Sequence, residues 1–180
     1  VNAGSGSLSV YAGNWVLGPG DRVASDSTLD IQSAAILNTN SADDDTFVRV
    51  HVNGGTLLGH GAVDANLSMS DGWTTPGASA GVINLNHLSF SSGTYRVDLD
   101  GTSPGNGSGK HDQLNATGSV KLGNDTVLET RVDYLPDLND RFVIINNDGS
   151  DPVMGSFVGL PEGTDFLASG ISLSISYVGG

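Results

Sequence analysis

The sequence contains no cysteine, so it can form neither a disulfide framework nor a metal site with thiolate ligands. This absence is compatible with a chain that is exported unfolded, because premature disulfides would obstruct its passage. No stretch approaches the roughly 18 consecutive apolar residues of a membrane-spanning helix, and we expect a segment that is not inserted in a membrane. No basic-then-apolar signal opens the chain, and its abrupt ends, Val1 and Gly180, favour a piece of something longer.

Basic side chains are also scarce. Seven Lys and Arg residues stand against 20 Asp and Glu residues, which gives a formal net charge of −13. Such a surface repels phosphate backbones, and no cluster of Lys or Arg could attract them. We therefore expect no nucleic-acid partner, and the acidic balance favours a soluble surface.

Aromatic residues make up only 6% of the chain and charged residues 15%, whereas Gly occurs 26 times. Most of the remaining polar residues are Ser, Thr, Asn and Asp, which with Gly favour turns. No segment shows a helical period over three turns, and Glu and Lys, which favour helices, are few. Many short strands separated by tight turns would use this composition well, and we predict an all-β fold.

Alternating apolar and polar residues predict individual strands. In 46–52, three valines share one face, and in 171–177 four apolar residues alternate with three serines. Four aliphatic residues are expected to point inward and to stack into ladders: Val97, Val120, Leu128 and Ile144. The stretch TSPGNGSGK at 102–110 predicts a surface loop rather than a domain boundary. Further strands are predicted at 82–90, 95–99, 114–122, 126–134, 141–145 and 153–158.

Regularly spaced turns in an all-β chain are compatible with a sandwich, a barrel or a solenoid. Three features favour the solenoid. Its thin stacked coils would suit the small aliphatic residues, and its compact corners would suit the recurrent Asn, Gly, Ser and Asp. Tight hairpin signals are also few, Asn53-Gly54 being the best placed.

Several motifs occur in the order of a known repeat. NGGTLLGHGAV at 53–63 follows a G-G-T-L-x-G-x-G-x-V pattern. In the later motif at 112–120, Ala116 stands where Val is commoner. The other motifs are TPGASAG at 75–81 with VINL at 82–85, DQLNATGSV at 112–120, FVIINND at 142–148, VMGSF at 153–157 and LPEG at 160–163. Over about residues 53–177 the chain thereby resembles the autotransporter-associated β-strand repeat of autotransporter passenger-like β-helix proteins.

The resemblance implies a right-handed parallel β-helix, a β-solenoid whose coils have roughly 20 to 25 residues. Residues 1–52 match more loosely, and we predict irregular β coils or an N-terminal cap there. Residues 53–180 would form the repeat-like solenoid, within one continuous domain 1–180. Irregular or capping strands are expected at the ends, since an open strand edge invites pairing with another chain.

Proteins with such repeats are large, bacterial, and secreted or anchored at the cell surface. The resemblance therefore implies an extracellular, non-catalytic segment that acts as a stalk or an adhesive passenger. Its partner would be an extracellular glycan or a cell-surface protein. The sequence shows no catalytic constellation, and we expect no enzyme activity.

Trp15 and Trp73 are the only tryptophans in the chain. Trp73 lies in the turn-rich stretch SDGWTTP at 70–76, close to Asp71, where a large ring would be partly exposed. An exposed ring beside Asp and Thr could stack on the C–H face of a sugar, although ordinary packing is the plainer interpretation. The alternative function is therefore a carbohydrate-binding module attached to a larger secreted enzyme or adhesin, with Trp73, Asp71 and Trp15 as its ligand-binding residues.

Two polar clusters complete the candidates. Lys110-His111-Asp112 could form a base oriented by a carboxylate, but a polar turn in which Asp112 binds nearby backbone amides is favoured, because no nucleophile is identifiable and Asx-type turns are common. Calcium is the one cofactor that the sequence allows, at 43–45 or at Asp148 with Asp151. Neither site has the ligand spacing of an EF-hand.

Overall fold

The computed structural model describes residues 2–3, 7–11, 13–16, 22–23, 28–32, 35–38, 49–62, 65–77, 79–148 and 151–178. All regular secondary structure in these residues is β-strand, so the all-β prediction is confirmed for the described part of the chain. None of these residues lies in a helix that is long and apolar enough to span a membrane.

The strands differ widely in length, from two residues to 13. They are β1 (Asn2–Ala3), β2 (Ser7–Val10), β3 (Gly13–Val16), β4 (Arg22–Val23), β5 (Thr28–Gln32), β6 (Ala35–Asn38), β7 (Arg49–Gly59), β8 (Gly61–Ala62), β9 (Asn66–Pro76), β10 (Val82–Leu85), β11 (Leu88–Leu99), β12 (Gln113–Ala116), β13 (Val120–Val132), β14 (Ile145–Asn147), β15 (Asp165–Ala168) and β16 (Ile171–Ser174).

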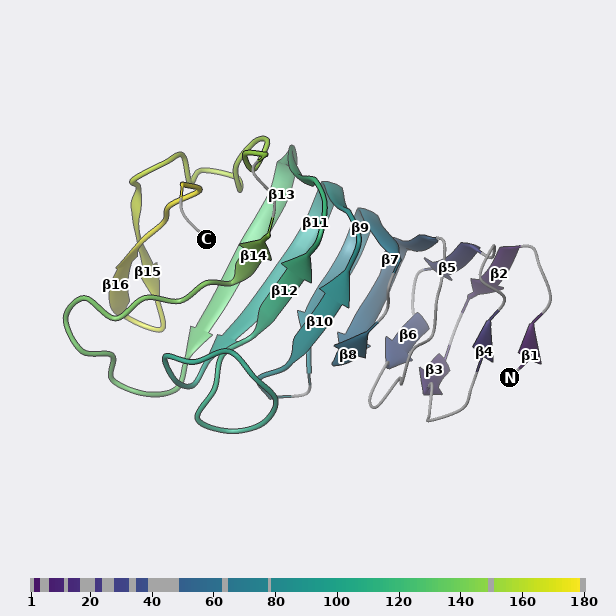
Figure 1. The fold of residues 1–180 in the computed structure, drawn as a ribbon, viewed down its shortest axis with the longest axis horizontal. Helices are drawn as coiled ribbons and strands as arrows, with labels where there is room; N and C mark the ends of the chain where they lie inside the picture. Colours follow the sequence, from purple (N-terminus) through teal and green to yellow (C-terminus); the bar gives the residue numbers. More distant parts are fainter. Residues whose placement is uncertain are drawn as a thin grey trace.

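The strands form four separate sheets (Figure 1). The largest has eight strands in the order β13-β11-β9-β7-β5-β2, with β6 beside β7 and β3 beside β6. A four-stranded sheet has the order β14-β12-β10-β8, and β1–β4 and β15–β16 form two pairs. From β7 to β14 the chain alternates between the two larger sheets, so neighbouring strands within each sheet run parallel.

Parallel pairing aligns apolar residues into buried rows. Val50, Leu67, Leu88 and Val120 are paired in register on β7, β9, β11 and β13, and all four are buried. Removing such a side chain from water contributes about 1.5–3 kcal/mol. Val97 is also fully buried, so the inward orientation is confirmed for Val97 and Val120. Leu128 and Ile144 are only partly buried and pack against the core.

A bulge crosses the largest sheet where glycines stand in adjacent strands. Gly72 of β9 and Gly93 of β11 have φ values of +92° and +95°, which side chains with a Cβ rarely adopt. A Cβ at Gly72 would also collide with the backbone of Gly55 in β7. The register between β7 and β9 shifts at this place, so the glycines separate the first half of each long strand from the second.

The prediction of a right-handed parallel β-helix is wrong. Coils of nearly constant length were expected, but Val50, Leu67, Leu88 and Val120 are separated by 17, 21 and 32 residues. The strands belong to separate sheets, and β15 and β16 pair antiparallel. The motifs predict strands and turns locally, whereas the connection lengths and the strand partners decide the fold. The division of the chain after residue 52 stays a prediction.

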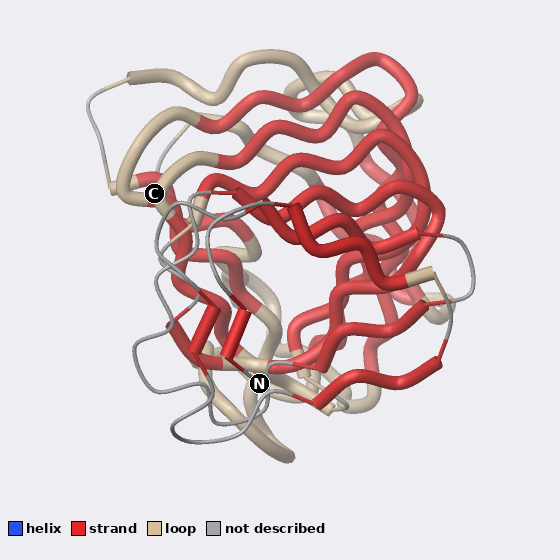
Figure 2. Tube along the Cα trace, turned by 90° about the vertical axis from the view of Figure 1, so that its right-hand side faces the viewer, coloured by secondary structure: helices blue, strands red, loops and turns tan. Residues whose placement is uncertain are grey.

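Loops of unequal size join the strands at the periphery (Figure 2). The predicted loop at 102–110 is one of them: no named strand falls in it, and most of its residues are exposed. After β13 the chain runs through 133–144 without a strand, and it ends in the β15–β16 hairpin. The sequence predicts that the apolar residues of 171–177 share a dry face and the serines the opposite one. This is confirmed, because Ile171, Leu173 and Ile175 are more buried than the serines between them.

Candidate functional site

Trp73 lies in the second half of β9, on the outward face of the largest sheet. Its side chain is 36% exposed, whereas the next residue, Thr74, is fully buried, as the alternation of a strand requires. Trp73 is paired with Thr56 of β7 and Thr94 of β11, and Thr94 is paired with Val127 of β13. These four outward residues, called the Trp73 row below, cross four parallel strands.

Arg96 and Glu129 extend the Trp73 row. The guanidinium carbon of Arg96 lies 4.5 Å from the centroid of the Trp73 ring, within the range of a cation–π contact. Arg96 Nε donates a hydrogen bond to Glu129 Oε1 at 3.0 Å, and the two side chains are 44% and 47% exposed. No described residue accepts a hydrogen bond from the terminal NH₂ groups of Arg96. A ring, a planar donor and a carboxylate therefore stand together on one face.

This arrangement suits a neutral polyhydroxylated ligand. The part of the Trp73 ring that Arg96 leaves open offers an apolar surface for C–H groups. The guanidinium offers paired donors, and the Glu129 carboxylate accepts hydrogen bonds from hydroxyls. Each described contact is weak at this exposure: the cation–π contact contributes about 0.5–1 kcal/mol and the ion pair about 0.2–1 kcal/mol. A ligand could therefore rearrange the group at little cost.

Asp71 is on the same face of β9 as Trp73, because both are exposed and the residue between them, Gly72, is buried. The Asp71 carboxylate accepts a hydrogen bond from the Gly72 amide at 2.7 Å. Asp71 thus helps to form the bulge that precedes Trp73. Whether it also contacts a ligand stays a prediction.

Trp15 falls in the row next to the Trp73 row, on the opposite face of the sheet. It is paired with Leu37 of β6, which is paired with Leu57 of β7. Leu57 is fully buried and belongs to the inward row. Trp15 is partly buried and packs against the hydrophobic core. The structure therefore brings Asp71 and Trp73 to one face and places Trp15 among the inward residues.

Asp112 occupies a second, buried site between the two larger sheets. Its Oδ1 accepts a hydrogen bond from the Gly81 amide at 2.7 Å, and its Oδ2 accepts one from the Asp98 amide at 2.8 Å. Asp112 does bind backbone amides, but the predicted local turn is wrong, because these amides are 31 and 14 residues away in the sequence. Burial raises the pKa of Asp112 to about 8, against the opposing effect of the two amides.

His111 does not orient toward Asp112. Its Nδ1 lies 3.0 Å from the Gly101 carbonyl oxygen, and its ring packs edge-on against Phe142. Burial lowers the pKa of His111, which favours the neutral imidazole. The base oriented by a carboxylate is therefore not formed, and both side chains connect distant parts of the backbone.

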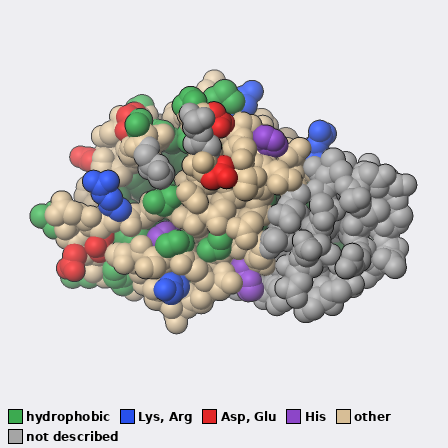
Figure 3. Space-filling model, viewed as in Figure 1, with side chains coloured by type: hydrophobic (Ala, Val, Ile, Leu, Met, Phe, Trp, Pro, Cys, Tyr) green, Lys and Arg blue, Asp and Glu red, His purple; other side chains and the backbone are tan. Residues whose placement is uncertain are grey.

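A cavity of about 820 Å³ between β13, 136–144 and β16 was not predicted from the sequence. Its apolar wall includes Leu128, Phe142, Ile144, Leu173 and Ile175. Hydrophobic side chains are visible on the surface at this end of the molecule (Figure 3). Each of these residues belongs to an apolar strand pattern that predicts core. The one sequence feature that hints at apolar surface here is LPDL at 135–138, a turn-like stretch with two leucines. In the structure, both Leu135 and Leu138 are strongly exposed.

Among the described residues, no group of three His, Cys, Asp or Glu side chains could hold a metal ion. The acidic run 43–45 lies outside the described residues. Asp148 and Asp151 flank two residues that are also not described, so calcium binding stays a prediction.

Comparisons with protein-family models, with curated proteins and with solved structures find no match to this chain. The likeness to the autotransporter-associated repeat therefore rests on the sequence motifs alone, and a functional assignment must rest on the chemistry of the described sites.

Proposed function

We propose that this chain is a non-catalytic adhesive segment of a large bacterial protein that is secreted or held at the cell surface. The exposed Trp73 row with Arg96 and Glu129 is its contact surface. The repeat-like motifs at 53–163 support the extracellular location, and the acidic, hydroxyl-rich composition supports a soluble surface. The buried amide contacts of Asp112 support a structural role for the densest polar cluster.

The proposed ligand is a glycan. A glycan ligand is also compatible with the alternative function, a carbohydrate-binding module in a larger enzyme or adhesin. The observation that supports this proposal is the arrangement of Trp73, Arg96 and Glu129 on one sheet face, beside the hydroxyls of Thr56 and Thr94. A net charge of −13 disfavours polyanionic polysaccharides, so a neutral glycan is preferred.

The test is retention of the purified protein on a panel of insoluble and immobilised polysaccharides, with and without calcium. We expect a neutral glycan to retain the protein and Trp73→Ala to weaken retention at least tenfold, which is about 1.4 kcal/mol. The matched control is Tyr11→Ala, which removes an aromatic side chain that is 71% exposed. It should leave retention unchanged.

Other outcomes would change the assignment. Equal retention of Trp73→Ala and the unmodified protein would exclude the Trp73 row as the contact surface. No retention on any glycan would direct the search to cell-surface proteins. Release of soluble product from a polysaccharide would contradict the non-catalytic proposal.

A further inference from the structure

β13 is the last strand of the largest sheet, so one of its edges faces away from β11. In the second half of β13, the first and last backbone groups on this edge form hydrogen bonds. The Thr126 carbonyl accepts a hydrogen bond from the Val158 amide at 2.8 Å. The Val132 amide donates one to Ser169 Oγ at 3.0 Å. After Val158, the next hydrogen bond from the chain to this edge comes at Ser169.

Leu128 and Thr130 lie between these two points and face the same edge, since residues two apart in a strand share their orientation. Among the described residues, none forms a hydrogen bond with the edge-facing N–H and C=O groups of Leu128 and Thr130. The open stretch from Thr126 to Val132 spans about 20 Å at about 3.3 Å per residue. Unpaired backbone groups of this kind are a template for another strand.

The cavity of about 820 Å³ lies directly beside this open edge. Its volume falls within the range of roughly 300–1,000 Å³ that is usual for ligand sites. Its walls come from β13, from the segment after it and from the hairpin, through Leu128, Thr130, Phe142, Ile144, Leu173 and Ile175. An extended chain on the edge would place alternate side chains in this apolar space, because successive side chains of a strand point to opposite faces.

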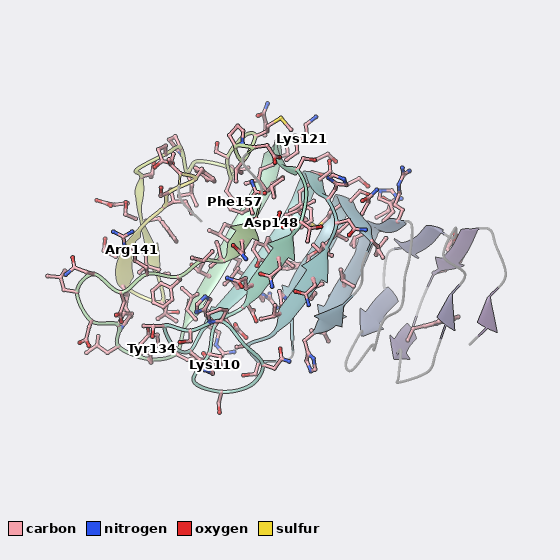
Figure 4. The ribbon with its side chains drawn as sticks, in the orientation of Figure 1. Lys110, Lys121, Tyr134, Arg141, Asp148 and Phe157 are labelled. Atoms are coloured by element: carbon pink, nitrogen blue, oxygen red, sulfur yellow. The ribbon has the colours of Figure 1, made fainter. Side chains whose placement is uncertain are left out.

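Charge favours a basic occupant. The cavity lining contains Asp137 and Asp140 against one basic residue, Arg141, which lies on the segment beside β16 (Figure 4). The whole chain carries a net charge of −13, so a second copy of it would be repelled. A segment with Lys or Arg at its outward positions would be attracted both to the lining and to the molecule as a whole.

We propose that the open edge of β13 and the adjoining cavity bind an extended, net-basic peptide segment of a partner protein by strand addition. Backbone hydrogen bonds to Leu128 and Thr130 hold the segment in register. Alternate apolar side chains of the segment fill the cavity between β13 and the hairpin. This site is separate from the Trp73 row and does not depend on the glycan proposal.

The first probe is a capped synthetic peptide, KVKVKVK, whose valines and lysines fall on opposite faces of a strand. Binding to the full chain is measured by isothermal titration calorimetry at low and moderate salt. The matched control is KVKPKVK, which has the same charge but cannot continue a strand pairing through its proline. We expect KVKVKVK to bind at least tenfold more tightly than the control.

A paired substitution tests the edge itself. Thr130→Pro removes the edge-facing amide, and its ring blocks the approach of another strand, while the hydrogen bonds to β11 are kept. Thr130→Val keeps the amide. We expect Thr130→Pro to bind the peptide at least tenfold more weakly and Thr130→Val to bind it normally. Thermal unfolding of both variants shows whether each is folded.

Amide hydrogen exchange in the unmodified protein gives a second, independent result. Peptide binding should slow exchange at Leu128 and Thr130 at least tenfold and leave the rest of β13 nearly unchanged. Equal binding of both peptides, or binding that leaves these two amides unprotected, would overturn the proposal. So would a failure of KVKVKVK to bind at all. Trp73→Ala should bind the peptide normally, which separates this test from the glycan assay.

Discussion

Two regions of the molecule contain similar apolar residues but bury them to different extents. They are the strands β7, β9, β11 and β13 and the C-terminal region 133–178. In the former, the row of Val50, Leu67, Leu88 and Val120 is paired on successive strands and almost completely buried. In the latter, Leu135, Leu138 and Leu167 are 84%, 93% and 75% exposed, and a large cavity separates the hairpin from β13. Apolar residues alone therefore do not close a core: they need other segments that pack over them.

The largest expected effect contrasts one leucine from each region. Leu67→Ala should lower the free energy of unfolding by about 3 kcal/mol, because Leu67 is only 1% exposed and its truncation leaves a cavity. Leu135→Ala should change it by less than about 0.5 kcal/mol. Urea denaturation followed by circular dichroism measures both. Similar losses in the two variants would erase the difference between the regions.

Asp112→Asn tests what joins the two larger sheets. The asparagine can accept a hydrogen bond from only one of the two amides that Asp112 binds, and its NH₂ group faces the other donor. We expect a loss of about 2 kcal/mol, the usual effect of one buried unsatisfied donor. Denaturation at pH 5 measures it. The exposed control Asp125→Asn should be nearly neutral, and an equal loss there would contradict the structural role of Asp112.

The pH dependence of stability follows from the same carboxyl group. Burial raises the pKa of Asp112 to about 8 in the folded state, above the value of about 3.9 that an unfolded chain has. The folded protein therefore binds the extra proton, and this contribution to stability is complete below pH 4 and lost as the pH rises through 8. Asp98, whose pKa burial also raises, acts in the same direction.

Unfolding measured from pH 4 to 9 should thus show decreasing stability, by about 1.4 kcal/mol per unit where Asp112 alone controls it. Asp112→Asn should show a clearly smaller decrease, to which Asp98 still contributes. A stability that rises with pH over this range would contradict the raised pKa of Asp112.

Tyr177→Phe tests how the C-terminal region is attached to the rest. The Tyr177 hydroxyl accepts a hydrogen bond from the Phe157 amide at 3.0 Å and donates one to the Leu160 carbonyl at 2.6 Å. We expect a loss of about 1 kcal/mol. Faster amide exchange confined to 153–178 would show that only this region loosens. Tyr11→Phe, at an exposed position, is the control.

Glu129→Gln should have the smallest effect on stability, below about 0.5 kcal/mol, because the ion pair with Arg96 is exposed. Glycan retention should nevertheless fall severalfold, since the charged acceptor beside Trp73 is lost. Asp125→Asn, which removes another exposed negative charge from β13, serves as the control for the change in net charge. A large loss of stability in Glu129→Gln would mean that the row supports the sheet rather than a ligand.

Local pattern predicted much of the larger sheets. The inward positions of Val97 and Val120 and the loop at 102–110 follow from alternation and turn chemistry. The long-range amide bonds of Asp112 do not, because turn chemistry predicts only a local turn there. The β-helix prediction failed because paired core residues are separated by 17 to 32 residues, which no local motif reveals. The contact of Arg96 with Trp73 was missed for a related reason, since the two residues lie on different strands.

The sequence by itself determined the all-β character, the two-residue alternation that decides which side chains point inward, the scarcity of basic side chains and the absence of thiols. Only the tertiary structure decided which strands pair, that Trp73 faces outward beside Arg96 while Trp15 packs inward, and that the edge of β13 stays open beside a cavity. The physical reason is range. Alternation and turn preferences act between neighbours in the chain, whereas strand partners and cavities arise from contacts between segments that are distant in the sequence.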